Sequence, residues 1–136
     1  SAVRSLDDAI AEADIISCVT MATEPLVKGR LLKPGAHIDL IGAYMPDMRE
    51  ADDDVARRAG HIFVDTRNNA EGSGDIAGPL AAGILRREDI VADLFDLCKG
   101  QHPGRESGGQ ITLYKNVGGG HLDMFAVKQL VARATG

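Results

Sequence analysis

Three consecutive glycines, Gly118, Gly119 and Gly120, form the feature of the sequence that most directly suggests ligand chemistry. They follow an alternating segment typical of a strand, residues 111–115, and precede a segment typical of a helix. A glycine turn in this place lets a ligand or phosphate approach the backbone and face the free N–H groups of the helix. The run lacks the G-x-G-x-x-G spacing of a dinucleotide fingerprint, so an ordinary tight turn is an equally good interpretation.

The four histidines are the candidates for metal binding or proton transfer: His37, His61, His102 and His121. They show no H-x-x-x-H spacing and no accompanying C-x-x-C pair, so we predict no metal site. His121 follows the glycine run, and a histidine in general suits proton transfer near neutral pH. A surface or helix-capping role is the preferred alternative for it.

Other polar clusters have simpler interpretations. Residues 52–54, three consecutive aspartates, are typical of the solvated first turn of a helix, because adjacent helical side chains point in different directions. Neither Ser17 nor Ser107 lies in a G-x-S-x-G elbow, which excludes that class of serine hydrolase. Cys18 and Cys98 are predicted to be free and structural.

Four segments predict the strands that would position these residues: 15–19, 36–41, 61–65 and 111–115. The first is a continuous apolar run, which indicates a strand covered on both faces of a parallel sheet. The order strand, turn, helix, strand implies crossover units, and ligands of such sheets bind beyond the carboxyl ends of the strands. Thr20, residues 42–45 and residues 65–66 are therefore the positions of interest.

Helices are predicted between these strands. Ser5 and Asp8 cap a first helix, and Asp47 with Glu50 would cap a second one that ends near Gly60. Residues 79–85 predict a short helix, 86–89 an exposed turn, and 94–98 a helical turn. The final helix, 122–132, carries an apolar stripe that would be buried against the sheet or a missing domain. The stripe consists of Leu122, Phe125, Ala126 and Leu130.

Composition excludes several classes of partner. The 136 residues are 44% hydrophobic, carry a net charge of −5 and contain only 4% aromatic residues, so neither a phosphate-binding basic face nor a base-stacking platform is evident. We expect no nucleic-acid partner. No apolar run approaches the length of a membrane span, and no signal-peptide core is present, so we expect a cytoplasmic protein with no membrane contact.

Three stretches, residues 13–25, 32–43 and 111–118, resemble the ornithine cyclodeaminase/mu-crystallin family in letters, order and spacing, and residues 46–50 and 63–66 fit as well. The resemblance implies an α/β fold with a partial Rossmann-like parallel sheet and a C-terminal helix. Residues 1–136 would form a single partial domain, the second half of an NAD(P)-binding domain in a longer parent that is typically a homodimer. The glycine fingerprint, the residue that reads the ribose and the basic substrate-binding residues would precede Val3, so the choice between NAD and NADP stays open.

The resemblance also assigns contacts with the dinucleotide. Residues 20–23 are similar to the loop that passes the cofactor, and residues 116–118 resemble the nicotinamide-side contact, although the family more often has Ser at position 116. The implied cofactor-binding residues are Thr20, Met21, Ala22, Gly42, Ala43, Asn116, Val117 and Gly118.

One departure bears on the reaction. Ornithine cyclodeaminases carry a catalytic aspartate two residues after the glycine equivalent to Gly42, and Tyr44 stands there in this sequence. A tyrosine is in general a poor base at neutral pH. The resemblance therefore favours an NAD(P)H-dependent reductase of cyclic ketimines such as pyrroline- or piperideine-2-carboxylate. The alternatives are an ornithine cyclodeaminase that recycles NAD and a non-enzymatic small-molecule-binding protein like some mu-crystallin-like members.

Overall fold

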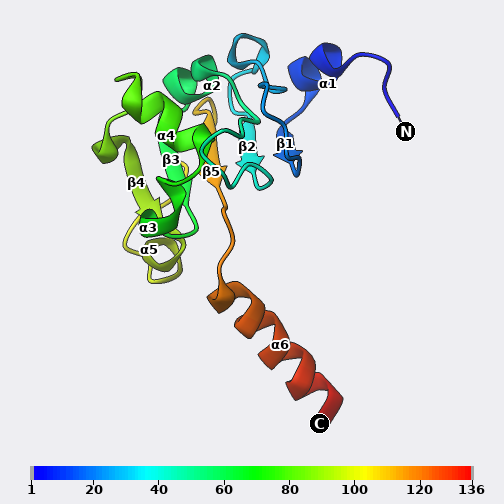
Figure 1. The fold of residues 1–136 in the computed structure, drawn as a ribbon, viewed down its shortest axis with the longest axis vertical. Coiled ribbons are helices and arrows are strands. Elements are labelled where there is room, and N and C mark those ends of the chain that lie inside the picture. The colour runs from blue at the N-terminus through cyan, green and yellow to red at the C-terminus, as the bar shows by residue number, and fades with distance from the viewer. Residues whose placement is uncertain (1, 136) are drawn as a thin grey trace.

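The computed structural model describes residues 2–135, and its centre is a five-stranded sheet with the order β1-β2-β5-β3-β4 (Figure 1). The strands are β1 (Ile15–Cys18), β2 (His37–Leu40), β3 (His61–Val64), β4 (Ile90–Asp93) and β5 (Thr112–Lys115). Every paired strand runs parallel to its neighbour. The last strand, β5, inserts between β2 and β3, so the ends of strands that are distant in sequence meet at one edge. This confirms the predicted α/β Rossmann-like sheet.

One face of the sheet forms the main core. Ile38, Leu40, Ile62, Val64 and Leu113 are at most 1% exposed and pack together. They occupy alternate positions of β2, β3 and β5, as expected for strands whose side chains alternate between the two faces.

Two strand predictions were incomplete. The first strand was expected to be covered on both faces, but β1 pairs only with β2 among the described residues, and Ile15 at its start is 70% exposed. An apolar composition therefore does not distinguish an edge strand from a central one. The strand β4 was missed because its two buried residues, Ile90 and Ala92, lie between charged residues and the following helix.

The helices of the domain are α1 (Leu6–Glu12), α2 (Asp53–Arg58), α3 (Arg67–Ala70), α4 (Gly74–Ala81) and α5 (Leu94–Cys98), with short 3-10 turns at η1 (Gly29–Leu31) and η2 (Arg87–Asp89). The predicted cap of α1 is confirmed, since the Ser5 hydroxyl accepts a hydrogen bond from the Asp8 N–H at 3.2 Å. The helical turn at 94–98 is also confirmed.

The prediction that Asp47 and Glu50 cap the second helix is wrong. Asp52 is the N-cap of α2, because its carboxylate accepts the N–H groups of Asp54 and Val55. Glu50 is instead fully buried. The consecutive aspartates do form the helix start that the sequence indicated. The helix predicted at 79–85 is α4, but it runs from Gly74 to Ala81: it begins earlier, because Ser73 caps it through the Asp75 N–H, and it ends before residues 82–85.

The final helix, α6 (Gly120–Thr135), projects away from the sheet (Figure 1). Its apolar stripe is therefore not buried against the sheet, one of the two partners expected for it, and Phe125 and Leu130 are 65% and 68% exposed. Met124 and Val127 on the other side of the helix are exposed as well. Across residues 2–135, no helix combines the length and the apolar character that crossing a membrane would require.

Candidate functional site

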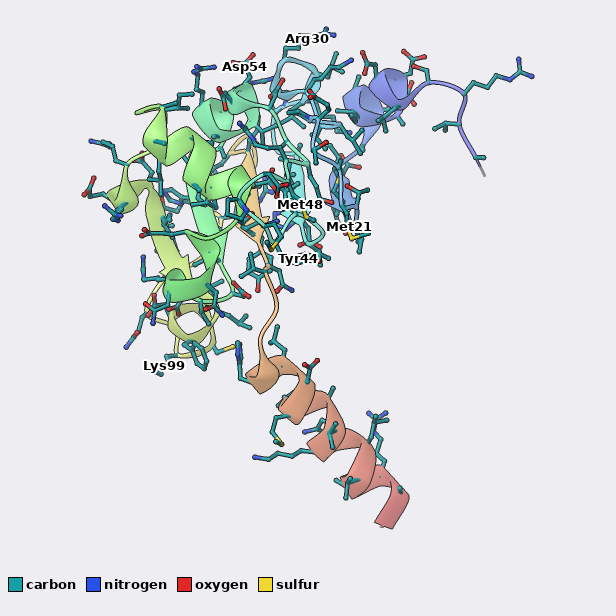
Figure 2. The ribbon with its side chains drawn as sticks, in the orientation of Figure 1. Met21, Arg30, Tyr44, Met48, Asp54 and Lys99 are labelled. Atoms are coloured by element: carbon teal, nitrogen blue, oxygen red, sulfur yellow. The ribbon has the colours of Figure 1, made fainter. Side chains whose placement is uncertain are left out.

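The candidate site is the edge of the sheet where the carboxyl ends of the strands meet. Three loops leave this edge after β1, β2 and β5, and they carry the predicted residues Thr20, Gly42 and Asn116 respectively. Figure 2 shows Met21 and Tyr44 at this same end of the sheet. Hydrogen bonds between backbones tie the loops at their bases, from Ile41 N to Cys18 O at 2.8 Å and from Asn116 N to Leu40 O at 2.9 Å.

The carboxylate of Glu50 lies beneath two of these loops. Its Oε1 accepts hydrogen bonds from the backbone N–H of Thr20 at 2.5 Å and from the Thr20 hydroxyl at 2.8 Å. Its Oε2 accepts the Gly42 N–H at 2.9 Å. One buried side chain thus holds the loop after β1 and the loop after β2. Because the Thr20 hydroxyl donates to Glu50, its proton is not available to a ligand.

Lys115 joins the third loop to this arrangement. Its ammonium Nζ lies 3.1 Å from Asp75 Oδ2 and 3.9 Å from Glu50 Oε2, and all three side chains are buried. Asp75 Oδ1 in turn accepts the backbone N–H groups of Glu50 and Ala51 at 2.8 and 3.1 Å. Each buried charge therefore has an opposite charge or several donors as partners, which is the condition for keeping charges inside a protein.

Two further buried groups support the edge. Asp65, at the end of β3, accepts the N–H of Val117 at 3.1 Å, and the Ser73 hydroxyl donates to the carbonyl of Ala43 at 2.6 Å. The side chain of Asn116 accepts the Gly118 N–H at 2.8 Å, which closes a tight turn. The predicted cofactor-binding residues of the loops after β2 and β5 are thereby each held from inside the protein.

The two glycines predicted to contact the cofactor are required for different reasons. A Cβ on Gly42 would lie 1.8 Å from the carbonyl oxygen of Thr20, so this glycine accommodates the neighbouring loop. Gly118 has a φ of 81°, which favours glycine, and a Cβ there would meet nothing within 4 Å. Open space and a left-handed backbone at Gly118 fit the close approach of a flat ring or amide group.

The remaining residues of the loop after β1 are less enclosed. Met21 is 69% exposed, whereas Ala22 is half-buried and its carbonyl accepts the Arg49 N–H at 2.7 Å. Together with the exposed Tyr44 and Met45, Met21 gives the edge an apolar rim. Such a rim suits an aromatic ring better than a phosphate.

Tyr44, which stands at the position of the family aspartate, and His121, the candidate for proton transfer, share no contact in the part of the chain that the structure describes. Tyr44 is 51% exposed on the loop after β2. His121 lies over Gly119 at the start of α6, and its ring centroid is 5.5 Å from that of Phe95 on α5. It lines a mainly apolar cavity of about 290 Å³ together with Cys98, Leu122 and Phe125. The structure therefore does not form an acid–base pair from these residues.

The thiol of Cys18 also lies near the edge. Burial, followed by the negative charges of Glu50 and Asp75, raises the pKa of this thiol to about 11. The group is therefore a neutral thiol at physiological pH and not a nucleophile. This agrees with the structural role predicted for it.

A histidine cluster that no sequence spacing indicated lies elsewhere, at the start of β3. Candidate ligand atoms of His61, His102 and Glu106 are all within 4.8 Å of one another. The Nδ1 atom of His102, however, accepts the N–H of Gly104 at 3.0 Å, which places the proton of the neutral ring on Nε2. Binding a metal through either nitrogen would disrupt this arrangement, so the cluster is a poor metal site.

Sequence reasoning missed Glu50, Asp75 and Lys115 as parts of the site. The available signal was a lysine in phase with the apolar Ile111 and Leu113 of an alternating strand, which predicts a buried partner of opposite charge. The sequence could not show which of the 20 acidic residues would supply that partner.

The chain resembles known proteins along its whole length. The model of the ornithine cyclodeaminase/mu-crystallin family matches residues 1–136. Protein SAR DEFICIENT 4 of Arabidopsis thaliana is 44% identical over 124 residues, which cover 91% of this chain and 38% of that protein. The Delta(1)-pyrroline-2-carboxylate reductase of Paracoccus denitrificans is 42% identical over 134 residues, 98% of this chain and 42% of that enzyme.

A solved structure agrees with the fold. The Delta(1)-pyrroline-2-carboxylate reductase of Thermococcus litoralis, in complex with NADH and L-proline, superposes with a TM-score of 0.81 at 36% identity. The match covers 85% of this chain and 36% of that one. The chain thus spans about two fifths of the length of the curated relatives described above.

Proposed function

Because the chain belongs to the ornithine cyclodeaminase/mu-crystallin family, we propose that residues 1–136 are the second half of a dinucleotide-binding domain. The longer parent protein would be an NAD(P)H-dependent reductase of cyclic ketimines such as Delta(1)-pyrroline-2-carboxylate. The relatives that share over 40% identity include a reductase of that name. The sheet edge described above is the part of the site that this chain contributes.

The edge fits the nicotinamide end of the cofactor. The loops after β1 and β2 present exposed apolar side chains such as Met21 and Met45, and the loop after β5 presents the open backbone at Gly118. We assign Thr20, Met21, Ala22, Gly42, Ala43, Asn116, Val117 and Gly118 to the surroundings of the nicotinamide. The pyrophosphate and adenosine would be bound by other parts of the parent, since no G-x-G-x-x-G sequence occurs here and the one G-x-G-x-x-A match, residues 72–77, does not directly follow a strand.

The proposed reaction requires little acid–base catalysis from the residues of this chain. When bound, NAD(P)H would supply a hydride to the imine carbon, and the imine nitrogen, already protonated, would become the amine nitrogen of the product. The residues of the edge would hold the ring and exclude water, so that the reacting atoms stay within reach. No base of this chain has to remove a proton.

The presence of a tyrosine at position 44 is the observation that favours a reductase over a cyclodeaminase. Tyr44 lies exposed beyond β2, where the family resemblance places an aspartate in cyclodeaminases, and the described residues provide no carboxylate hydrogen-bonded to it. Deamination of ornithine needs a group that handles protons at the amine or the adjacent carbon. Reduction of a preformed ketimine does not, so the reductase is the better fit.

We also propose that the parent is a homodimer. The support comes from α6, a helix of 16 residues whose exposed large apolar side chains lie on several sides. Such a helix is normally covered by another part of the protein or by a second subunit. Light scattering of the parent tests the assembly.

The experiment for the function compares two substrates. The parent is incubated with NAD(P)H and pyrroline-2-carboxylate, and separately with ornithine and catalytic NAD. We expect cofactor oxidation with the imine and little ammonia from ornithine. Steady formation of proline and ammonia from ornithine, without reductase activity, would identify a cyclodeaminase. Cofactor binding without turnover of either substrate would indicate a binding protein.

A further inference from the structure

We propose that Glu50 is the positioning residue of the nicotinamide edge, and that Lys115 and Asp75 hold it in place. The inference rests on the proposed function, because it gives these buried groups a role in hydride transfer. Glu50 itself contacts loops and not the cofactor, so it would act through Thr20 and Gly42.

The first argument is the distribution of its hydrogen bonds. Glu50 Oε1 receives both donors of Thr20, and Oε2 receives the donor of Gly42, so each oxygen fixes a different loop. The side chain is fully buried, and water cannot replace either contact. A change in the carboxylate therefore alters the spacing between the two loops.

The second argument is that Glu50 is itself held in place by its neighbours. Asp75 holds its backbone N–H at 2.8 Å, and the ammonium of Lys115 lies between the two carboxylates. Lys115 is also the last residue of β5, directly before Asn116. The positions of all three loops are thus set by one buried cation and two buried anions.

This construction predicts a specific kinetic effect. Hydride transfer depends on sub-ångström distances, and a displacement of about 1 Å can lower a rate roughly 100-fold. Overall affinity for the dinucleotide depends largely on pyrophosphate contacts, which we place outside this chain. Loss of the Glu50 carboxylate should therefore lower kcat far more than it changes the KM for NAD(P)H.

The test uses three variants of the full parent protein. Glu50→Gln replaces one accepting oxygen by an NH₂ group, which cannot accept from Thr20 or Gly42. Glu50→Asp retains all three buried charges and shortens the side chain by one methylene, so that its carboxylate cannot reach both loops as Glu50 does. Val55→Ala is the matched control, because it opens a cavity in the fully buried core on α2 and makes none of the contacts described for Glu50.

We expect Glu50→Gln to lower kcat about 100-fold while the KM for NAD(P)H changes less than about threefold. Amide hydrogen exchange should accelerate at Thr20 and Gly42, and Glu50→Asp should show the same two effects with the buried charges retained. Val55→Ala should lower stability without either effect. Unchanged exchange at Thr20 and Gly42, or a kcat loss no larger than in the control, overturns the proposal.

Failure of the proposed function would look different. If the wild-type parent reduces no cyclic imine, the reductase assignment falls. The exchange measurement still decides whether Glu50 fixes the two loops.

Discussion

The carbonyl oxygen of Thr20 occupies the space in which a side chain of residue 42 would begin. A Cβ on Gly42 would lie 1.8 Å from that oxygen and 2.2 Å from the Thr20 nitrogen, both far inside contact distance. The loops after β1 and β2 can approach this closely only because residue 42 is glycine. The same two residues are joined by the buried carboxylate of Glu50.

Gly42→Ala should therefore destabilise the chain by about 3 kcal/mol or more, because the obstructing atoms are backbone and cannot rotate away. Gly109→Ala is the control, since a Cβ there would meet nothing within 4 Å and its φ is not positive. Urea denaturation of both variants measures the difference. Equal free energies of unfolding would show that the two loops are not packed as described.

Tyr44→Phe should leave the reductase activity of the parent within about threefold of the wild type, because the proposed reaction needs no proton from this side chain. The side chain is 51% exposed, so the effect on stability should stay within about 0.5 kcal/mol. Steady-state kinetics across pH check both the rate and its profile. A loss of about 100-fold, with one limb of the pH profile removed, would make Tyr44 a proton donor.

The two cysteines should react at very different rates. The pKa of Cys18 is raised to about 11 by burial and by nearby carboxylates, so almost none of it is thiolate near pH 8, whereas Cys98 is exposed. Iodoacetamide treatment of the folded chain followed by peptide mass spectrometry should find label on Cys98 first. Labelling of Cys18 at an equal rate would contradict its burial beside the edge.

His37 should contribute to the pH dependence of stability. Burial lowers its pKa below the ordinary value of 6.5, so near and below that pH the unfolded state binds more protons than the folded state. The free energy of unfolding therefore falls as the pH drops through this window. In His37→Gln, which can still pair with the Thr112 hydroxyl that His37 contacts at 2.8 Å, the fall should be smaller. Urea titrations of both proteins at about pH 7.5 and 5.5 measure this fall in the free energy of unfolding. An equal fall in His37→Gln and in the wild type would contradict the account.

The sequence predicted those features that depend on local patterns. Four of the five strands followed from short apolar or alternating runs, and the cap of α1 followed from Ser5. Glu50 shows the limit, since its spacing from Asp47 matches a helix cap while its carboxylate is needed 30 residues away at Thr20. Asp52, the residue directly before α2, is the N-cap instead of Asp47.

Long-range placement could not be predicted for a similar reason. Lys115, Asp75 and Glu50 meet only because β5 inserts between β2 and β3, which no local pattern of this sequence reveals. The position of α6 was also beyond sequence reasoning, because its apolar stripe indicates burial without indicating the partner. The family resemblance indicated the loop residues that lie at the edge. It did not indicate the buried charges of Glu50, Asp75 and Lys115 that hold those loops.

Isotope transfer tests the central claim most directly, namely that the parent reduces a cyclic ketimine with a hydride from a nicotinamide cofactor. The parent is given pyrroline-2-carboxylate with NADH or NADPH carrying deuterium at the transferable position, and the product is analysed by mass spectrometry. We predict proline with one deuterium at the carbon of the former imine, formed in equal amount to the cofactor oxidised. Cofactor that is not consumed, or proline that carries no deuterium, would contradict the account.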